Sequence, residues 1–129
     1  MNRFIILFLF SLGILSTCVV AVEVIPLNEG WNFHRGFQAP ASEIVKVTLP
    51  HTWNAGDGMF GNADYYRGLC IYSRKLSVPA HYLGKRFFLK VMAAQTVADI
   101  FIDHHFVMQH KGGYTAFVAE LTDFLVPGT

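Results

Sequence analysis

The sequence predicts an all-β fold, an antiparallel β-sandwich, and three observations support this prediction. Short runs rich in β-branched and aromatic residues recur along the chain, turn residues separate them, and no window of useful length has helical periodicity. Runs repeated at roughly 8–12-residue spacing are typical of a sandwich. The runs are VEVIPL (22–27), VKVTL (45–49), CIYSRKLSV (70–78), RFFLKVM (86–92), VADIFID (97–103), FVMQ (106–109) and TAFVAEL (115–121).

The first three runs are recognised by their composition and by the turns that bound them. Residues 22–27 and 45–49 are mostly Val, Ile and Leu, and residues 70–78 combine Ile, Tyr, Leu and Val. Such side chains pack well on a pleated surface. The stretches NEG, PASE and NAGDGMFGNAD separate these runs, so each run is predicted to be one strand.

Two of the later runs, residues 86–92 and 97–103, show the alternation of a strand with one buried face. In a strand, successive side chains point to opposite faces, and polar residues such as Lys90 and Asp99 fall on one face only. Residues 121–125, which begin at the last residue of the last run, are expected to form a single turn. The face predicted to be buried is apolar at every position: Phe87, Leu89, Val91, Ala98, Ile100 and Ile102.

Residues 1–21 have the pattern of a secretory signal peptide. Arg3 precedes an apolar run from Phe4 to about Leu15, and small or modest residues follow as far as Ala21. Such a run is too short to span a bilayer comfortably. We therefore expect an exported protein, periplasmic or extracellular, whose mature domain is residues 22–129. The alternative is a lipoprotein signal with Cys18 acylated, which would attach the protein to a membrane.

Without the signal peptide the chain is formally neutral. The sequence has 10 Lys and Arg and 9 Asp and Glu; Arg3 belongs to the signal peptide, so 10 − 1 = 9 basic and 9 acidic residues remain. There is thus no electrostatic reason to expect a nucleic-acid partner or binding to an anionic membrane surface. Cys70 is the only cysteine of the mature range, so packing must hold the fold without an intramolecular disulfide.

Three histidines and a glycine pair could suggest a metal site and a phosphate-binding loop, but the sequence around them does not support either. His104, His105 and His110 lie around a predicted hairpin, but no carboxylate or cysteine stands at a recognised metal-ligand spacing. Gly112–Gly113 lacks the strand-to-helix context of a phosphate loop, and the pair is expected to permit a bend or a close approach of the backbone. We predict no metal site and no cofactor.

An ordered series of motifs runs through residues 22–129. In this order the motifs resemble the N-terminal sugar-binding domain of glycoside hydrolase family 2, the family of β-galactosidases, β-glucuronidases and β-mannosidases. The chain is most similar to secreted β-galactosidase-like members. The motifs are WNFH (31–34), LPHTWN (49–54), DYYRGLCIYSRKLSVP (64–79), GKRFFLKV (84–91), VADIFID (97–103) and HKGGYTAFVAELTDFL (110–125).

The resemblance implies an architecture for the domain and its neighbours. The family's domain is a jelly-roll-like, galactose-binding-domain-like sandwich that precedes an immunoglobulin-like domain and a (β/α)₈ barrel. In the family one more strand follows the turn that resembles residues 126–128, so we expect this sandwich to be incomplete at its C-terminal end. Where the family often has Asn-Gly, this chain has Asp103 and His104, which predicts a looser hairpin.

The resemblance also implies a carbohydrate partner and a site in the loop at residues 54–64. In similar β-galactosidases, loops of this sandwich help to line the subsite for the terminal sugar. The alternative is that the Asn and Asp residues only form turns, because their side chains bond to their own backbone in tight loops. The candidates for sugar contact are Asn54, Asp57, Asn62 and Asp64, with Tyr65 as an apolar wall.

No catalytic residue is predicted within the chain. Retaining hydrolysis of a β-glycoside needs two carboxyl groups about 5–5.5 Å apart, and in family 2 both are barrel glutamates. The chain's mature glutamates show no such pairing in the sequence: Glu23, Glu29, Glu43 and Glu120. The resemblance implies a domain that shapes the substrate subsite of a larger glycosidase; the alternative is a free-standing carbohydrate-binding or adhesion module.

Overall fold

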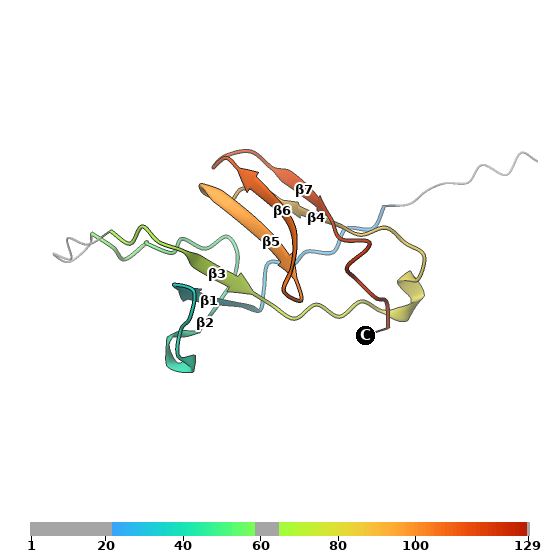
Figure 1. Cartoon of the computed structure of the whole chain (residues 1–129), viewed down its shortest axis with the longest axis horizontal. Coiled ribbons are helices and arrows are strands. Elements are labelled where there is room, and N and C mark those ends of the chain that lie inside the picture. The colour runs from blue at the N-terminus through green and yellow to red at the C-terminus, as the bar shows by residue number, and fades with distance from the viewer. Residues whose placement is uncertain (1–21, 59–64, 129) are drawn as a thin grey trace, which may run out of the picture.

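The structure, a computed structural model, describes residues 22–58 and 65–128. The expected signal peptide, including Cys18, lies outside these residues. Two short 3₁₀ turns occur, η1 (Ala41–Glu43) and η2 (Ala80–Tyr82), and no helix in the described ranges is long and apolar enough to cross a membrane. The strands are β1 (Trp31–Arg35), β2 (Val45–Val47), β3 (Cys70–Ser73), β4 (Phe88–Val91), β5 (Val97–Ile102), β6 (His105–Lys111) and β7 (Phe117–Glu120) (Figure 1).

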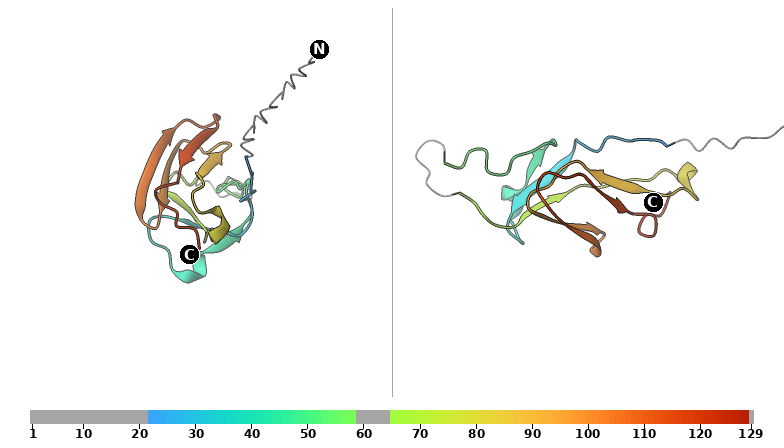
Figure 2. Two further views of the ribbon diagram at one scale, coloured as in Figure 1. Left: turned by 90° about the vertical axis from the view of Figure 1, so that its right-hand side faces the viewer. Right: turned by 90° about the horizontal axis from the view of Figure 1, so that it is seen from above.

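Every strand pair is antiparallel. Strands β2, β1 and β3 form a three-stranded sheet in that order, with Phe33 opposite Val45 on one side and Tyr72 on the other. Strand β4 pairs with β7, and β5 forms a hairpin with β6. Strand β6 also lies beside β7. The β4–β7 and β5–β6 pairs form a layer on the other side of the interior from the three-stranded sheet (Figures 1 and 2), which confirms the predicted sandwich.

The alternation predicted for β4 and β5 is confirmed, and β7 alternates as well. Burial alternates with the residue number in all three strands, and in β7 Phe117 and Ala119 are buried while Val118 and Glu120 are exposed. Among the described residues the buried hydrophobic core is small, because many large apolar side chains remain on the surface. The core consists of Phe33, Val78, Phe117, Ala119 and Leu121.

An aromatic cluster on the three-stranded sheet surrounds Phe33. The Phe33 ring lies 4.8 Å from the ring of His51 and 5.0 Å from that of Tyr72. His51 Nδ1 and the Tyr72 hydroxyl are hydrogen-bonded at 2.9 Å. The pKa of Tyr72 is raised above its ordinary value, mainly because the hydroxyl is buried and to a smaller extent because Cys70 is nearby. His51 therefore packs within the aromatic cluster, and its Nδ1 atom is hydrogen-bonded to Tyr72.

The strand prediction was wrong in three places. Residues 22–27 form no strand; Val22 and Val24 are exposed, and Glu23 accepts a hydrogen bond from the Tyr82 hydroxyl. The strand predicted over residues 70–78 ends at Ser73. Strand β1 was not among the predicted runs, because WNFHR is half polar and has no β-branched residue.

The hairpin between β5 and β6 is tight, contrary to the looser turn that its sequence suggested. Pairing continues to Ile102 and His105, so only Asp103 and His104 form the turn. Both have positive φ, 45° and 70°, as a type I′ turn requires at its two central positions. In this region a side chain crowds the following carbonyl, at a cost of roughly 1–2 kcal/mol per residue.

His104→Gly is expected to stabilise the chain by about 0.5–1 kcal/mol, because glycine has no Cβ to strain the turn. Lys46→Gly is the matched control: Lys46 is an exposed residue of β2, where glycine should destabilise by about 0.5–1 kcal/mol. Urea unfolding of both variants measures the two changes. A loss of stability in both would contradict the assignment of strain to the turn.

The glycine pair after β6 accommodates a close approach, as predicted. Gly112 has φ 148°, and a Cβ there would lie 3.3 Å from both His110 Nε2 and Thr115 Oγ1. The His110 ring stacks on Phe117 with centroids 4.2 Å apart. The bend thus lets a β6 side chain cover a core residue of β7.

Candidate functional site

The candidate site is the loop between β2 and β3. After Thr52 the chain forms consecutive turns, in which the Asp57 N–H donates to the Asn54 carbonyl at 3.0 Å. The described part of the loop stops at Gly58 and resumes at Tyr65. The predicted contacts Asn62 and Asp64 lie between them, outside the described residues, and stay predictions.

Asp57 links the two ends of the loop to the sheet. Its carboxylate accepts hydrogen bonds from the Arg35 guanidinium at 3.0 and 3.2 Å and from the Tyr66 backbone N–H at 3.1 Å. The side chain of Asp57 is only 13% exposed. The Tyr66 N–H and then Arg35 hold the pKa of Asp57 below its ordinary value, because both favour the charged carboxylate. Three hydrogen bonds from these two residues already occupy the carboxylate.

Arg35 and Tyr66 complete this brace, and neither was a candidate from the sequence. Arg35 ends β1, donates to the Trp53 carbonyl at 2.6 Å and lies 4.8 Å from the centroid of the Tyr66 ring. The Tyr66 hydroxyl accepts from the Gly36 N–H at 3.1 Å and donates to the Leu69 carbonyl at 2.8 Å. These bonds join β1 to both sides of the loop, so we call Arg35, Asp57 and Tyr66 the loop brace.

Asn54 and Tyr65 are placed differently from Asp57. Tyr65 is 55% exposed, and its ring lies over Gly58, where a Cβ would approach it to 3.2 Å. Asn54 is half-buried at the first turn of the loop. Within the described part of the chain, neither the Asn54 amide nor the Tyr65 hydroxyl has a hydrogen-bond partner. Of the three described candidates, these two have polar groups available to a ligand.

Two of the chain's glutamates, Glu120 and Glu23, are each bound by a different partner. Arg86 donates two hydrogen bonds of 3.0 Å to Glu120, and the Thr122 hydroxyl donates a third at 3.0 Å. Arg86 and then Thr122 hold the pKa of Glu120 below its ordinary value. A glycosidase acid needs a raised pKa, so this environment opposes that role. Glu23 accepts from Tyr82 at 2.7 Å.

The histidines that flank the β5–β6 hairpin are not gathered with other ligands. His110 stacks on Phe117 and bonds to Thr115, whereas His104 occupies the turn itself. Across residues 22–58 and 65–128, no group of three or more His, Cys, Asp or Glu side chains is arranged to hold a metal ion.

Comparison with known proteins reveals extended similarity to glycosidases. No protein-family model matches the chain. The β-glucuronidase of Bacteroides fragilis is 37% identical over 128 residues, which is 99% of this chain and 18% of the relative. The chain thus spans about a fifth of that protein's length.

Two solved structures share the fold. One, from Bacteroides fragilis and assigned as a β-galactosidase, has a TM-score of 0.73 and 30% identity over 83% of this chain and 17% of its own. A Bacteroides uniformis β-glucuronidase has a TM-score of 0.69 and 35% identity over 80% of this chain and 13% of its own. The chain therefore belongs to glycoside hydrolase family 2, in which it corresponds to a β-sandwich domain of β-glucuronidases and β-galactosidases.

Proposed function

We propose that the chain is the sugar-binding domain of an exported family 2 glycosidase that acts on a β-galactoside or a β-glucuronide. In this proposal the domain shapes the substrate subsite, and the catalytic glutamates belong to a barrel elsewhere in a longer protein. The names of the relatives and the small share of their length that this chain spans support the proposal. The proposal that the protein is exported rests on the signal-peptide pattern of residues 1–21. The alternative to a cleaved signal peptide is a lipoprotein signal in which Cys18 is acylated.

The observation that carries the proposal is the loop brace. Arg35 and Tyr66 hold Asp57 from two sides, which connects residues 57 and 66 to the sheet without using the side chains of Asn54 and Tyr65. A site for a sugar needs polar groups held in place and an aromatic surface for the C–H face of the ring. Asn54 would donate or accept at a hydroxyl, and Tyr65 would form the wall. Asp57 is then a positioning residue, while Asn62 and Asp64 are further proposed contacts.

The apolar surface of the domain supports its association with other domains. Eighteen large hydrophobic side chains are exposed among the described residues, against four large ones that are buried with Ala119. Surfaces of this kind are commonly covered by protein partners. We propose that an immunoglobulin-like domain and a catalytic barrel cover part of this surface, since the relatives are several times longer than this chain.

A domain exchange tests the proposal. In the B. fragilis β-glucuronidase, the matched 128 residues are replaced by those of this chain. The chimaera is expected to hydrolyse the relative's own aryl substrate. Asn54→Ala or Tyr65→Ala in the chimaera should raise KM or lower kcat/KM about five- to thirtyfold, as a lost contact of about 1–2 kcal/mol predicts, with no change in Tm.

Glu29→Ala is the control for this experiment, because Glu29 is exposed and distant in sequence from the loop. It should leave both KM and Tm unchanged. If the folded chimaera is active but all three variants have the same KM and kcat/KM as the unmodified chimaera, the loop residues are turn formers and the proposed subsite is wrong.

A further inference from the structure

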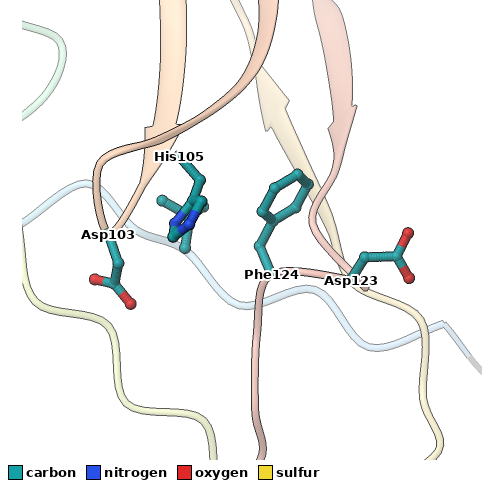
Figure 3. Close-up of a pocket in the computed structure, with 5 residues that line it drawn as sticks. Asp103, His105, Asp123 and Phe124 are labelled. Atoms are coloured by element: carbon teal, nitrogen blue, oxygen red, sulfur yellow. The ribbon is translucent and has the colours of Figure 1, made fainter.

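A cavity of about 310 Å³ lies between the β5–β6 hairpin and the turn that follows β7. Its walls come from residues about 20 positions apart in the sequence, and they combine apolar, aromatic and acidic side chains. Neither the loop brace nor the sugar candidates take part in it. The lining residues are Ile102, Asp103, His105, Asp123 and Phe124 (Figure 3).

Both walls of the cavity are well fixed. On one side, Ile102 and His105 are the last paired residues of the hairpin. On the other, the N–H of Phe124 donates to the carbonyl of Leu121 at 3.0 Å, and Leu121 itself is 4% exposed in the core. The cavity therefore does not depend on a segment that must first become ordered.

The side chains form a slot with acidic edges. The His105 and Phe124 rings stand on facing sides of the cavity, whereas the carboxylates of Asp103 and Asp123 point away from it on opposite sides (Figure 3). No lysine or arginine lines the cavity. Neither carboxylate has a hydrogen bond or an ion pair within the described residues. Two negative charges thus flank an aromatic slot with no cation to balance them.

We propose that this cavity binds the side chain of an arginine presented by a partner protein. A guanidinium is planar, is weakly hydrated for a cation and stacks on aromatic rings. The flanking carboxylates would attract its charge, and Ile102 would contact its methylene stem. A uronic acid or a phosphate would be repelled.

The test titrates the full ¹⁵N-labelled chain with Nα-acetyl-L-arginine amide at low ionic strength and follows the backbone amide signals by NMR. We expect saturable shifts at residues 102–105 and 123–124, and weaker binding at higher salt. The double variant Asp103→Asn with Asp123→Asn should weaken binding by about fivefold or more, and Phe124→Leu should weaken it as well.

Asp99→Asn is the matched control, because Asp99 is an exposed carboxylate of the same hairpin that bonds Gln109 outside the cavity. It should leave binding unchanged. Methyl β-D-galactoside is titrated in parallel and should not shift these signals. Shifts with the galactoside instead of the arginine probe would overturn the proposal in favour of a sugar site, as would arginine binding that is absent or unaffected in the double variant. Neither result bears on the domain exchange, whose residues lie elsewhere.

Discussion

Phe33→Ala is expected to destabilise the chain by about 3–5 kcal/mol, the range for an aromatic side chain removed from a packed core. Phe33 is 7% exposed at the centre of β1, and it contacts the rings of both His51 and Tyr72. Its removal would leave a cavity beside a hydrogen-bonded polar pair. Because a small domain has a net stability of roughly 5–15 kcal/mol, this one substitution would remove much of it.

Urea unfolding followed by tryptophan fluorescence measures this effect. Phe37→Ala is the control, since Phe37 is 79% exposed and its replacement should change the free energy of unfolding by less than about 0.5 kcal/mol. If Phe33→Ala is folded without urea, its unfolding curve gives the loss of stability directly. If it is already unfolded without urea, Phe33→Leu should give a smaller, measurable loss. Equal stabilities for Phe33→Ala and Phe37→Ala would show that the aromatic cluster is not part of the core.

Strand faces could be predicted because alternation is a local property. Val91 and Phe117 face inward as opposite members of the β4–β7 pair, and every other residue of these strands follows from one such position. Strand existence was harder to predict where tertiary pairing decides it. Strand β1 is a strand because β2 and β3 pair with both of its edges, although it has no β-branched residue and three of its five residues are polar. The Val- and Ile-rich residues 22–27 have no such pairing and form no strand.

The site could be located from the sequence only as a loop. Its composition and the family resemblance indicated residues 54–64, but the bond between Arg35 and Asp57 joins positions 22 residues apart. No local pattern shows that Asp57 is occupied while Tyr65 is exposed. Because strand β1, which Arg35 ends, was itself not predicted, the sequence offered no sign of the brace. The acidic cavity likewise depends on two turns that meet only in the folded chain.

The chain alone is expected to have no glycosidase activity, although its family is named for that reaction. Retaining hydrolysis needs a nucleophilic carboxylate and a carboxylic acid about 5–5.5 Å apart. Glu120 is instead bound by Arg86 with a lowered pKa, and Glu23 is bound separately by Tyr82. In the proposed function the domain positions a sugar without supplying either group, so the chain alone should lack the activity of an intact enzyme completely.

The most direct measurement is the release of 4-nitrophenol from its β-D-galactoside and β-D-glucuronide by the purified chain, beside the intact B. fragilis β-glucuronidase. A subsite-shaping domain predicts a rate for the chain that equals the buffer blank with both substrates, while the intact enzyme turns over its own. Turnover that co-elutes with the chain through chromatography, and that is abolished by replacing one of its glutamates, would contradict this function. The glutamates to be replaced are Glu23, Glu29, Glu43 and Glu120.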